Sequence, residues 1–196
     1  MSFLVKSLNK QNIVNCYFCN KSHIARECPD EIFMSPIFKK KIGNMMEYWF
    51  ANNFNCPECN HDILTVIGNH TPSFDVVCNK CYQKFEVKSK CLSVSVLPND
   101  IQLYHGSYIN YIYKLNKGLN LIVIIYGVNR LNKDIIIKEV LYANNIALKN
   151  KNIINVLKKN DSNLSIIFIK NKAKIQKLVI NTTNTILSFK KYFNLF

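Results

Sequence analysis

Two pairs of cysteines with C-x2-C spacing constrain this chain more than any other feature of its sequence. Cys56 and Cys59 form the first pair, Cys78 and Cys81 the second, and residues 60–77 separate them. Two such pairs at this separation are typical of a closed tetrahedral zinc site, to which each pair contributes two thiolates. The sequence therefore predicts a zinc ribbon built around these four cysteines.

Charged residues surround the second cysteine pair in a strand-like pattern. Asp75 precedes the pair, and FEVKSK at 85–90 alternates apolar and charged residues as a strand does. Residues two apart on a strand share a face, so Glu86 and Lys88 point the same way. If zinc fixes the turn at 78–81, the strand through Asp75 folds back beside this one, and two carboxylates and an ammonium converge. That set outlines a metal-dependent phosphodiesterase site, although an E-x-K triplet taken alone more often marks a solvated strand face.

The cysteine pairs followed by FEVKSK resemble the catalytic domain of DpnI-type restriction endonucleases in the PD-(D/E)xK superfamily. That family builds a zinc ribbon into an α/β nuclease core, a mixed sheet flanked by helices. The resemblance implies that Asp75, Glu86 and Lys88 form the catalytic set, with Asp75 and Glu86 holding a Mg²⁺. It also implies that the four ribbon cysteines bind a structural zinc.

The segments on both sides extend this resemblance. A helix is predicted at 35–54, with Ser35 as its N-cap and Pro36 at its first position. It is similar to the family's first core helix, whose Glu often completes the active site. Glu47 occupies that place, and an ordinary water-facing helix residue is the alternative interpretation. The segment 106–115 resembles the family's next helix, and its tyrosines either stack on bases or pack in the core.

A second cysteine motif, CYFCNKSHIARECPD, precedes this domain and resembles the zinc knuckle of retroviral nucleocapsids. In that family four residues, one of them a Gly, lie between the second Cys and the His. In this chain three residues lie there, Asn20, Lys21 and Ser22. The resemblance implies a second structural zinc, whose candidate ligands are Cys16, Cys19, His23 and Cys28. Knuckles bind single-stranded nucleic acid by stacking on unpaired bases. The candidate contacts are Tyr17 and Ile24 for bases, and Lys21 and Arg26 for phosphates. A structural cap or protein-binding module is the alternative.

The composition favours a polyanionic partner. Lys and Arg number 26 against 12 Asp and Glu, a net charge of +14, which indicates nucleic acid before membrane. The longest apolar run, 121–128, is far shorter than the roughly 20 residues that cross a bilayer. The start of the sequence lacks the features of a signal peptide, so we expect a soluble intracellular protein. Cys91 belongs to neither motif, and we expect it to be a buried thiol.

The remaining elements are predicted from periodicity. We expect a helix at 103–115, a buried strand at 120–128 and a strand of edge character at 135–142. Further on, 165–171 and 173–180 predict a hairpin, and 183–196 predicts a helix.

These observations predict a knuckle over residues 1–30 and a nuclease domain over 31–196. The predicted function is Mg²⁺-dependent cleavage of double-stranded DNA, restriction-enzyme-like and, as the resemblance implies, directed to adenine-methylated sites. The knuckle adds a contact with single-stranded nucleic acid. The rival prediction is a non-enzymatic zinc protein that binds single-stranded DNA or RNA through the knuckle and the ribbon.

Overall fold

The computed structural model describes the chain from residue 36 onward, with gaps. The described residues are 36–67, 74–92, 100–104, 108–129, 134–150, 154–159, 163–169, 175–180 and 186–188. The chain divides into two compact units, Met1–Lys39 and Lys40–Phe196, and the fold below is that of the second. The predicted knuckle lies outside the described residues, together with Cys16, Tyr17, Cys19, Lys21, His23, Ile24, Arg26 and Cys28.

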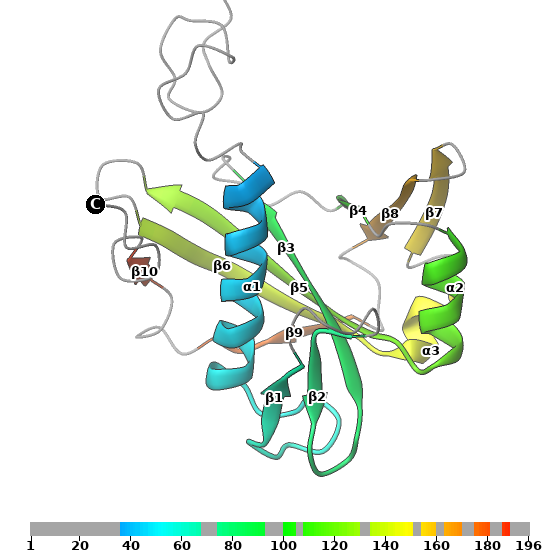
Figure 1. Ribbon diagram of the computed structural model, residues 1–196, viewed down its shortest axis with the longest axis horizontal. Helices are drawn as coiled ribbons and strands as arrows, with labels where there is room; N and C mark the ends of the chain where they lie inside the picture. The colour runs from blue at the N-terminus through cyan, green and yellow to red at the C-terminus, as the bar shows by residue number, and fades with distance from the viewer. Residues whose placement is uncertain are drawn as a thin grey trace, which may run out of the picture. The chain divides into compact units, whose positions relative to one another are not determined.

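Seven strands of the described chain form one mixed sheet, in the order β1-β2-β3-β5-β6-β10, with β9 also paired to β6 (Figure 1). Only β3 and β5 run parallel; the other described pairs of this sheet are antiparallel. The strands are β1 (Leu64–Val66), β2 (Val76–Cys78), β3 (Lys84–Cys91), β5 (Asn120–Asn129), β6 (Asp134–Ala143), β9 (Gln176–Leu178) and β10 (Ile186–Ser188). The prediction of an α/β fold with a mixed sheet is confirmed at this level.

Strand β5 lies inside the sheet, and both of its faces are covered. Every residue from Asn120 to Gly127 is buried, which explains the unbroken apolar run LIVIIYG. The buried strand predicted at 120–128 is thus confirmed. The edge character predicted for 135–142 is wrong, because β6 pairs with β5 on one side and with β9 and β10 on the other.

Helix α1 (Pro36–Asn53) covers one face of the sheet. It begins at Pro36 as predicted, because proline has the helical φ already fixed and the first turn needs no N–H from it. The predicted N-cap Ser35 lies outside the described residues. Ile42, Met46 and Phe50 recur at four-residue spacing and are fully buried. The Phe50 ring packs edge-on against Phe85 of β3, with 6.2 Å between centroids.

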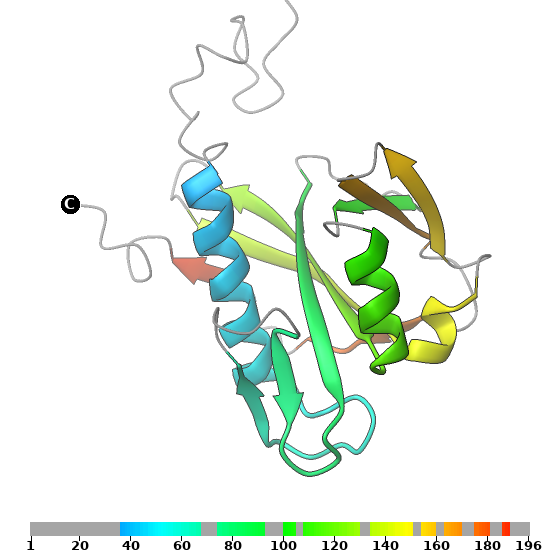
Figure 2. The ribbon, with the colours of Figure 1, turned by 45° about the vertical axis from the view of Figure 1, so that its right-hand side comes forward.

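The opposite face carries α2 (Tyr108–Asn116), α3 (Asn145–Leu148) and β4 (Asp100–Tyr104). Leu121, Val123 and Ile125 of β5 belong to one buried cluster with Tyr111 and Leu115 of α2. Strand β4 belongs to a second, antiparallel sheet, which has the order β4-β8-β7 and includes β7 (Ile154–Lys159) and β8 (Asn163–Ile169). Figure 1 and Figure 2 both show β3 between α1 and α2, so a site on β3 is bordered by both helices.

Several sequence predictions fail outside this core. The hairpin of 165–171 with 173–180 does not form, since β8 pairs with β4 and β7 while β9 pairs with β6. The helix predicted at 183–196 is wrong at residues 186–188, which form β10. The helix predicted at 103–115 starts only at Tyr108.

Two further observations concern the predicted burial of Cys91 and the membrane. Cys91 is exposed rather than buried, because it ends β3 at the rim of the sheet. Within the described part of the chain, no helix combines the length and the apolarity that crossing a membrane requires.

Candidate active site and metal centre

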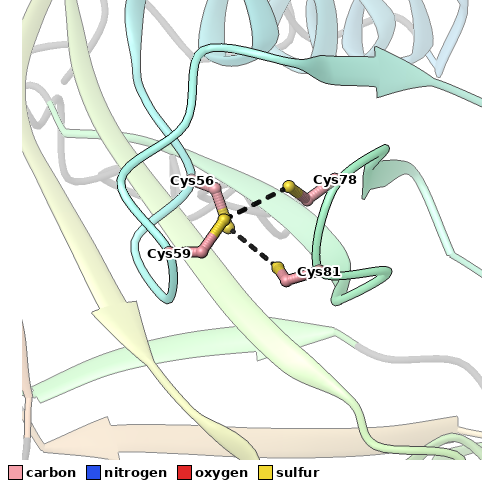
Figure 3. Close-up of side chains that lie close together, drawn as sticks. All are labelled: Cys56, Cys59, Cys78 and Cys81. Atoms are coloured by element: carbon pink, nitrogen blue, oxygen red, sulfur yellow. Dashed lines mark hydrogen bonds between the residues drawn. The ribbon is translucent and has the colours of Figure 1, made fainter.

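The four ribbon cysteines come together in space as predicted (Figure 3). Their sulfur atoms all lie within 4.8 Å of one another, and Cys56–Cys81 and Cys59–Cys78 are each 3.6 Å apart. A tetrahedral zinc with Zn–S bonds of about 2.3 Å places its sulfurs about 3.8 Å apart. Among the described residues, these are the one group of His, Cys, Asp or Glu close enough to hold a metal with three or more ligands. The cluster fits a metal such as zinc.

The two zinc turns, residues 56–60 and 78–82, are built alike. In each, the first cysteine accepts a backbone hydrogen bond from the residue four positions on, at 2.8 Å from Asn60 and 2.9 Å from Tyr82. In each, that residue has a positive φ, 56° at Asn60 and 59° at Tyr82. Bulky residues rarely adopt this left-handed conformation, which therefore needs a structure that holds it. Two matching turns facing each other are the local basis of the cysteine cluster.

The second zinc turn favours a thiolate. Burial raises the pKa of the Cys78 thiol, but backbone N–H groups of Cys81 and Lys80 hydrogen-bond its sulfur and bring the pKa down to about 7. Burial raises the pKa of Cys56 well above its usual range. A metal cation would stabilise both thiolates, because it is the thiolate that acts as a ligand.

The first zinc turn is tied to the sheet through Glu58. The Tyr142 hydroxyl of β6 donates a hydrogen bond to the Glu58 carboxylate. The Tyr142 ring also packs against Phe85 of β3, at 6.1 Å between centroids. The ribbon is thereby anchored to the two strands, β3 and β6, that flank β5.

Asp75 lies directly before β2, and β2 folds back antiparallel to β3 across the second zinc turn. The Asp75 N–H donates to the Phe85 carbonyl at 3.0 Å, and the Val87 N–H donates to Asp75 Oδ2 at 2.7 Å. Asp75 is therefore held opposite Glu86. The hairpin expected from the cysteine spacing is confirmed.

Glu86 is buried between two lysines. Its residue is 3 % exposed, so the alternative of a solvated strand face is wrong for this carboxylate. Lys88 Nζ lies 2.6 Å from Glu86 Oε1, which confirms that the two share a face of β3. Lys114 Nζ, from α2, lies 2.5 Å from Glu86 Oε2. Each oxygen of this carboxylate thus contacts a different ammonium group.

The pKa shifts show that these charges act on one another. Burial and the Glu86 carboxylate raise the pKa of Asp75, although Lys88 opposes them. Burial alone would lower the pKa of Lys88, but Glu86 and Asp75 outweigh it and raise that pKa. Lys88 is therefore a firmly charged ammonium within reach of both carboxylates.

Glu47 of α1 belongs to the same group of charges. Burial and the neighbouring Asp75 carboxylate raise its pKa from 4.5 to about 7, with Lys88 acting in the opposite direction. The residue is half-buried. We call Glu47, Asp75, Glu86, Lys88 and Lys114 the charged cluster.

Lys114 is the member of the charged cluster that the sequence analysis missed. A signal was present, because Lys114 lies three residues after Tyr111 and directly before Leu115, both in the buried cluster. A lysine on the apolar side of a helix needs a buried partner. Its Nζ also lies 6.0 Å from the centroid of the Phe74 ring, next to Asp75.

One mixed sheet carries the four-cysteine cluster, which fits a metal such as zinc, beside the charged cluster, an arrangement compatible with a restriction-enzyme-like nuclease. The comparison with protein families agrees, since the DpnI model, described as the Dam-replacing family, matches residues 37–193. The chain belongs to this family. Membership indicates a nuclease whose substrate is DNA.

Proposed function

We propose that the protein hydrolyses phosphodiester bonds of double-stranded DNA at the charged cluster, with a PD-(D/E)xK core and a catalytic Mg²⁺. The observation that carries this is the β2–β3 hairpin, which holds Asp75 opposite Glu86 and places Lys88 on the same face. Family membership supports the same reaction class.

Asp75 and Glu86 are the proposed ligands of the Mg²⁺. This ion prefers hard carboxylate oxygens, commonly one or two, and keeps several waters, so the pair suffices. The Val87 N–H fixes the orientation of the Asp75 carboxylate. A carboxylate oxygen has two lone pairs, so one that contacts an ammonium can still accept a metal ion. Glu47 adds a third carboxylate beside Asp75.

Lys88 is the proposed catalytic lysine. Its side chain is 28 % exposed, against 4 % for Glu86, so Lys88 is more accessible to solvent than the carboxylate it contacts. It can orient the attacking water and screen the negative charge that develops on the phosphate. When bound, Mg²⁺ supplies a Lewis acid that polarises the phosphate and makes water more acidic.

The cysteine cluster is proposed to hold a structural zinc with no part in the chemistry. Four thiolates close the coordination sphere, so no position remains for substrate. Its contribution is to fix the second zinc turn, which joins β2, directly preceded by Asp75, to β3, which carries Glu86. We further propose that residues 1–30 form the knuckle with a second zinc and contact single-stranded nucleic acid, and that the nuclease domain spans 31–196.

We propose adenine-methylated sites as the substrate, on the basis of the family resemblance. Parallel digestion of adenine-methylated and unmethylated plasmid, with and without Mg²⁺, tests this. Cleavage of the methylated plasmid alone is the expected result, and Asp75→Asn should abolish it. Tight nucleic-acid binding without cleavage, by a protein with full zinc, would instead support the non-enzymatic rival.

A further inference from the structure

Lys114 reaches the charged cluster from a different element than the other lysine. Lys88 shares β3 with Glu86, whereas Lys114 comes from α2 and contacts the second oxygen of that carboxylate at 2.5 Å. The residue is only 7 % exposed. A buried ammonium is costly unless a carboxylate compensates it, so Lys114 and Glu86 stabilise each other.

The backbone around Lys114 is held in place. The Leu119 N–H donates to the Lys114 carbonyl at 2.9 Å, and the Asn145 side chain donates to the Leu115 carbonyl at 2.8 Å. The end of α2 is therefore closed by the turn that precedes β5 and is bonded to α3. Lys114 is presented to Glu86 by a fixed scaffold.

The charge of the cluster depends on this lysine. Whatever the protonation of its carboxylates, the cluster has two ammonium groups with Lys114 and one without it, so the loss of Lys114 makes its net charge more negative by one unit. Opposite charges attract more strongly inside a protein than in water. A divalent ion must therefore bind more tightly to the cluster that lacks Lys114.

We propose that Lys114 compensates the charge of Glu86 before the ion arrives, and thereby weakens divalent-ion binding. This role rests on the metal site proposed above. It makes a prediction of definite sign, because a lysine that only braced α2 against β3 would act the other way. Its loss would then leave Glu86 misplaced, and ion binding would weaken.

Calorimetric titration with Ca²⁺ separates the two roles without measuring cleavage. Ca²⁺ binds oxygen ligands, so it should leave the cysteine cluster undisturbed. The full zinc-loaded chain is titrated as the parent and as Lys114→Met, Lys114→Gln and Lys114→Arg. Lys117→Met is the matched control, because Lys117 is an exposed lysine in the turn that follows the same helix. Asp75→Asn locates the signal at the charged cluster.

We expect Lys114→Met and Lys114→Gln to bind Ca²⁺ about tenfold more tightly than the parent, because one nearby positive charge is removed. Lys114→Arg and Lys117→Met should stay within about threefold of the parent, since the first keeps the charge and the second removes a screened one. If both neutral variants bind Ca²⁺ no more tightly than the parent, the role proposed for Lys114 is overturned, but the proposed metal site is not. Absence of binding by the parent overturns the proposed metal site as well.

Folding is followed in the same samples by circular dichroism and zinc content. If the neutral variants unfold without Ca²⁺ and refold with it, the added ion has replaced the charge of Lys114, as proposed. Unfolding that Ca²⁺ does not reverse overturns the proposal, because Lys114 is then needed as a structural brace.

Discussion

The backbone N–H of Val87 donates a hydrogen bond to the Asp75 carboxylate, so the residue that precedes β2 is locked to β3 at 2.7 Å. The contact holds Asp75, directly before β2, next to the part of β3 that carries Glu86. It depends on the second zinc turn, which reverses the chain between those strands. The second zinc turn and the residues Asp75, Glu86 and Lys88 therefore belong to one hairpin, so a change at the cysteine cluster should also affect the charged cluster.

We predict that the purified protein contains two zinc ions per chain, one in the cysteine cluster and one in the N-terminal knuckle. Cys78→Ser should remove the first, because three thiolates hold the ion less tightly than four. It should also lower cleavage, since the turn that positions Asp75 is then loosened. Elemental analysis checks both, and a parent chain with a single zinc would eliminate the knuckle site.

Deletion of residues 1–30 should leave the cleavage chemistry intact, because the charged cluster lies wholly within the unit Lys40–Phe196. Binding of single-stranded nucleic acid should weaken about tenfold or more, as one stacked base is worth about 1–3 kcal/mol. Turnover and binding are measured on the same preparation. An insoluble or unfolded deletion would identify the segment as a structural cap.

Glu47 should make stability pH-dependent in protein without added divalent ions. Its pKa is raised in the folded state, from 4.5 to about 7, by burial and by the Asp75 carboxylate. The folded state therefore binds more protons than the unfolded state between these values, and stability falls as pH rises through this window. Glu47→Gln carries no such charge, so its melting temperature should rise relative to the parent between about pH 5 and pH 8.

Thermal unfolding at several pH values measures that difference. Asp62→Asn serves as the control, because Asp62 is an exposed carboxylate outside the charged cluster. A constant difference between Glu47→Gln and the parent across the window would show that the Glu47 pKa is not raised.

The sequence predicted the parts of the site that depend on neighbours along the chain. The cysteine spacing predicted the metal centre and the hairpin that sets Asp75 beside Glu86, because a turn of fixed length leaves few alternatives. Lys114 was missed, since its partner Glu86 is distant in sequence and only the packing of α2 brings them together.

The same physical reason explains the errors in the sheet. The strand at 135–142 was predicted to have edge character, but its Glu139 is buried, and Lys177 of β9 compensates the charge of Glu139 at 3.3 Å. Adjacent segments 165–171 and 173–180 looked like a hairpin because the nearest partner is the default choice. In the structure, β8 pairs with β4 and β9 pairs with β6, both distant in sequence. Local periodicity carries no information on such pairings.

Substitution of Lys88 is the most direct test of the proposed catalytic residues. Lys88→Ala should lower kcat by about 10²- to 10³-fold with zinc content unchanged, because a charge that stabilises the transition state is lost. DNA affinity should change little, as for an interaction made mainly in the transition state.

The comparison variant is Lys90→Ala. Lys90 shares the strand face but lies about 13 Å from Glu86 along β3, at about 3.3 Å per residue. Lys88 by contrast contacts Glu86 at 2.6 Å. Single-turnover cleavage of methylated plasmid measures both variants, and a Lys88→Ala protein that cuts at the parent rate would refute the nuclease site proposed here.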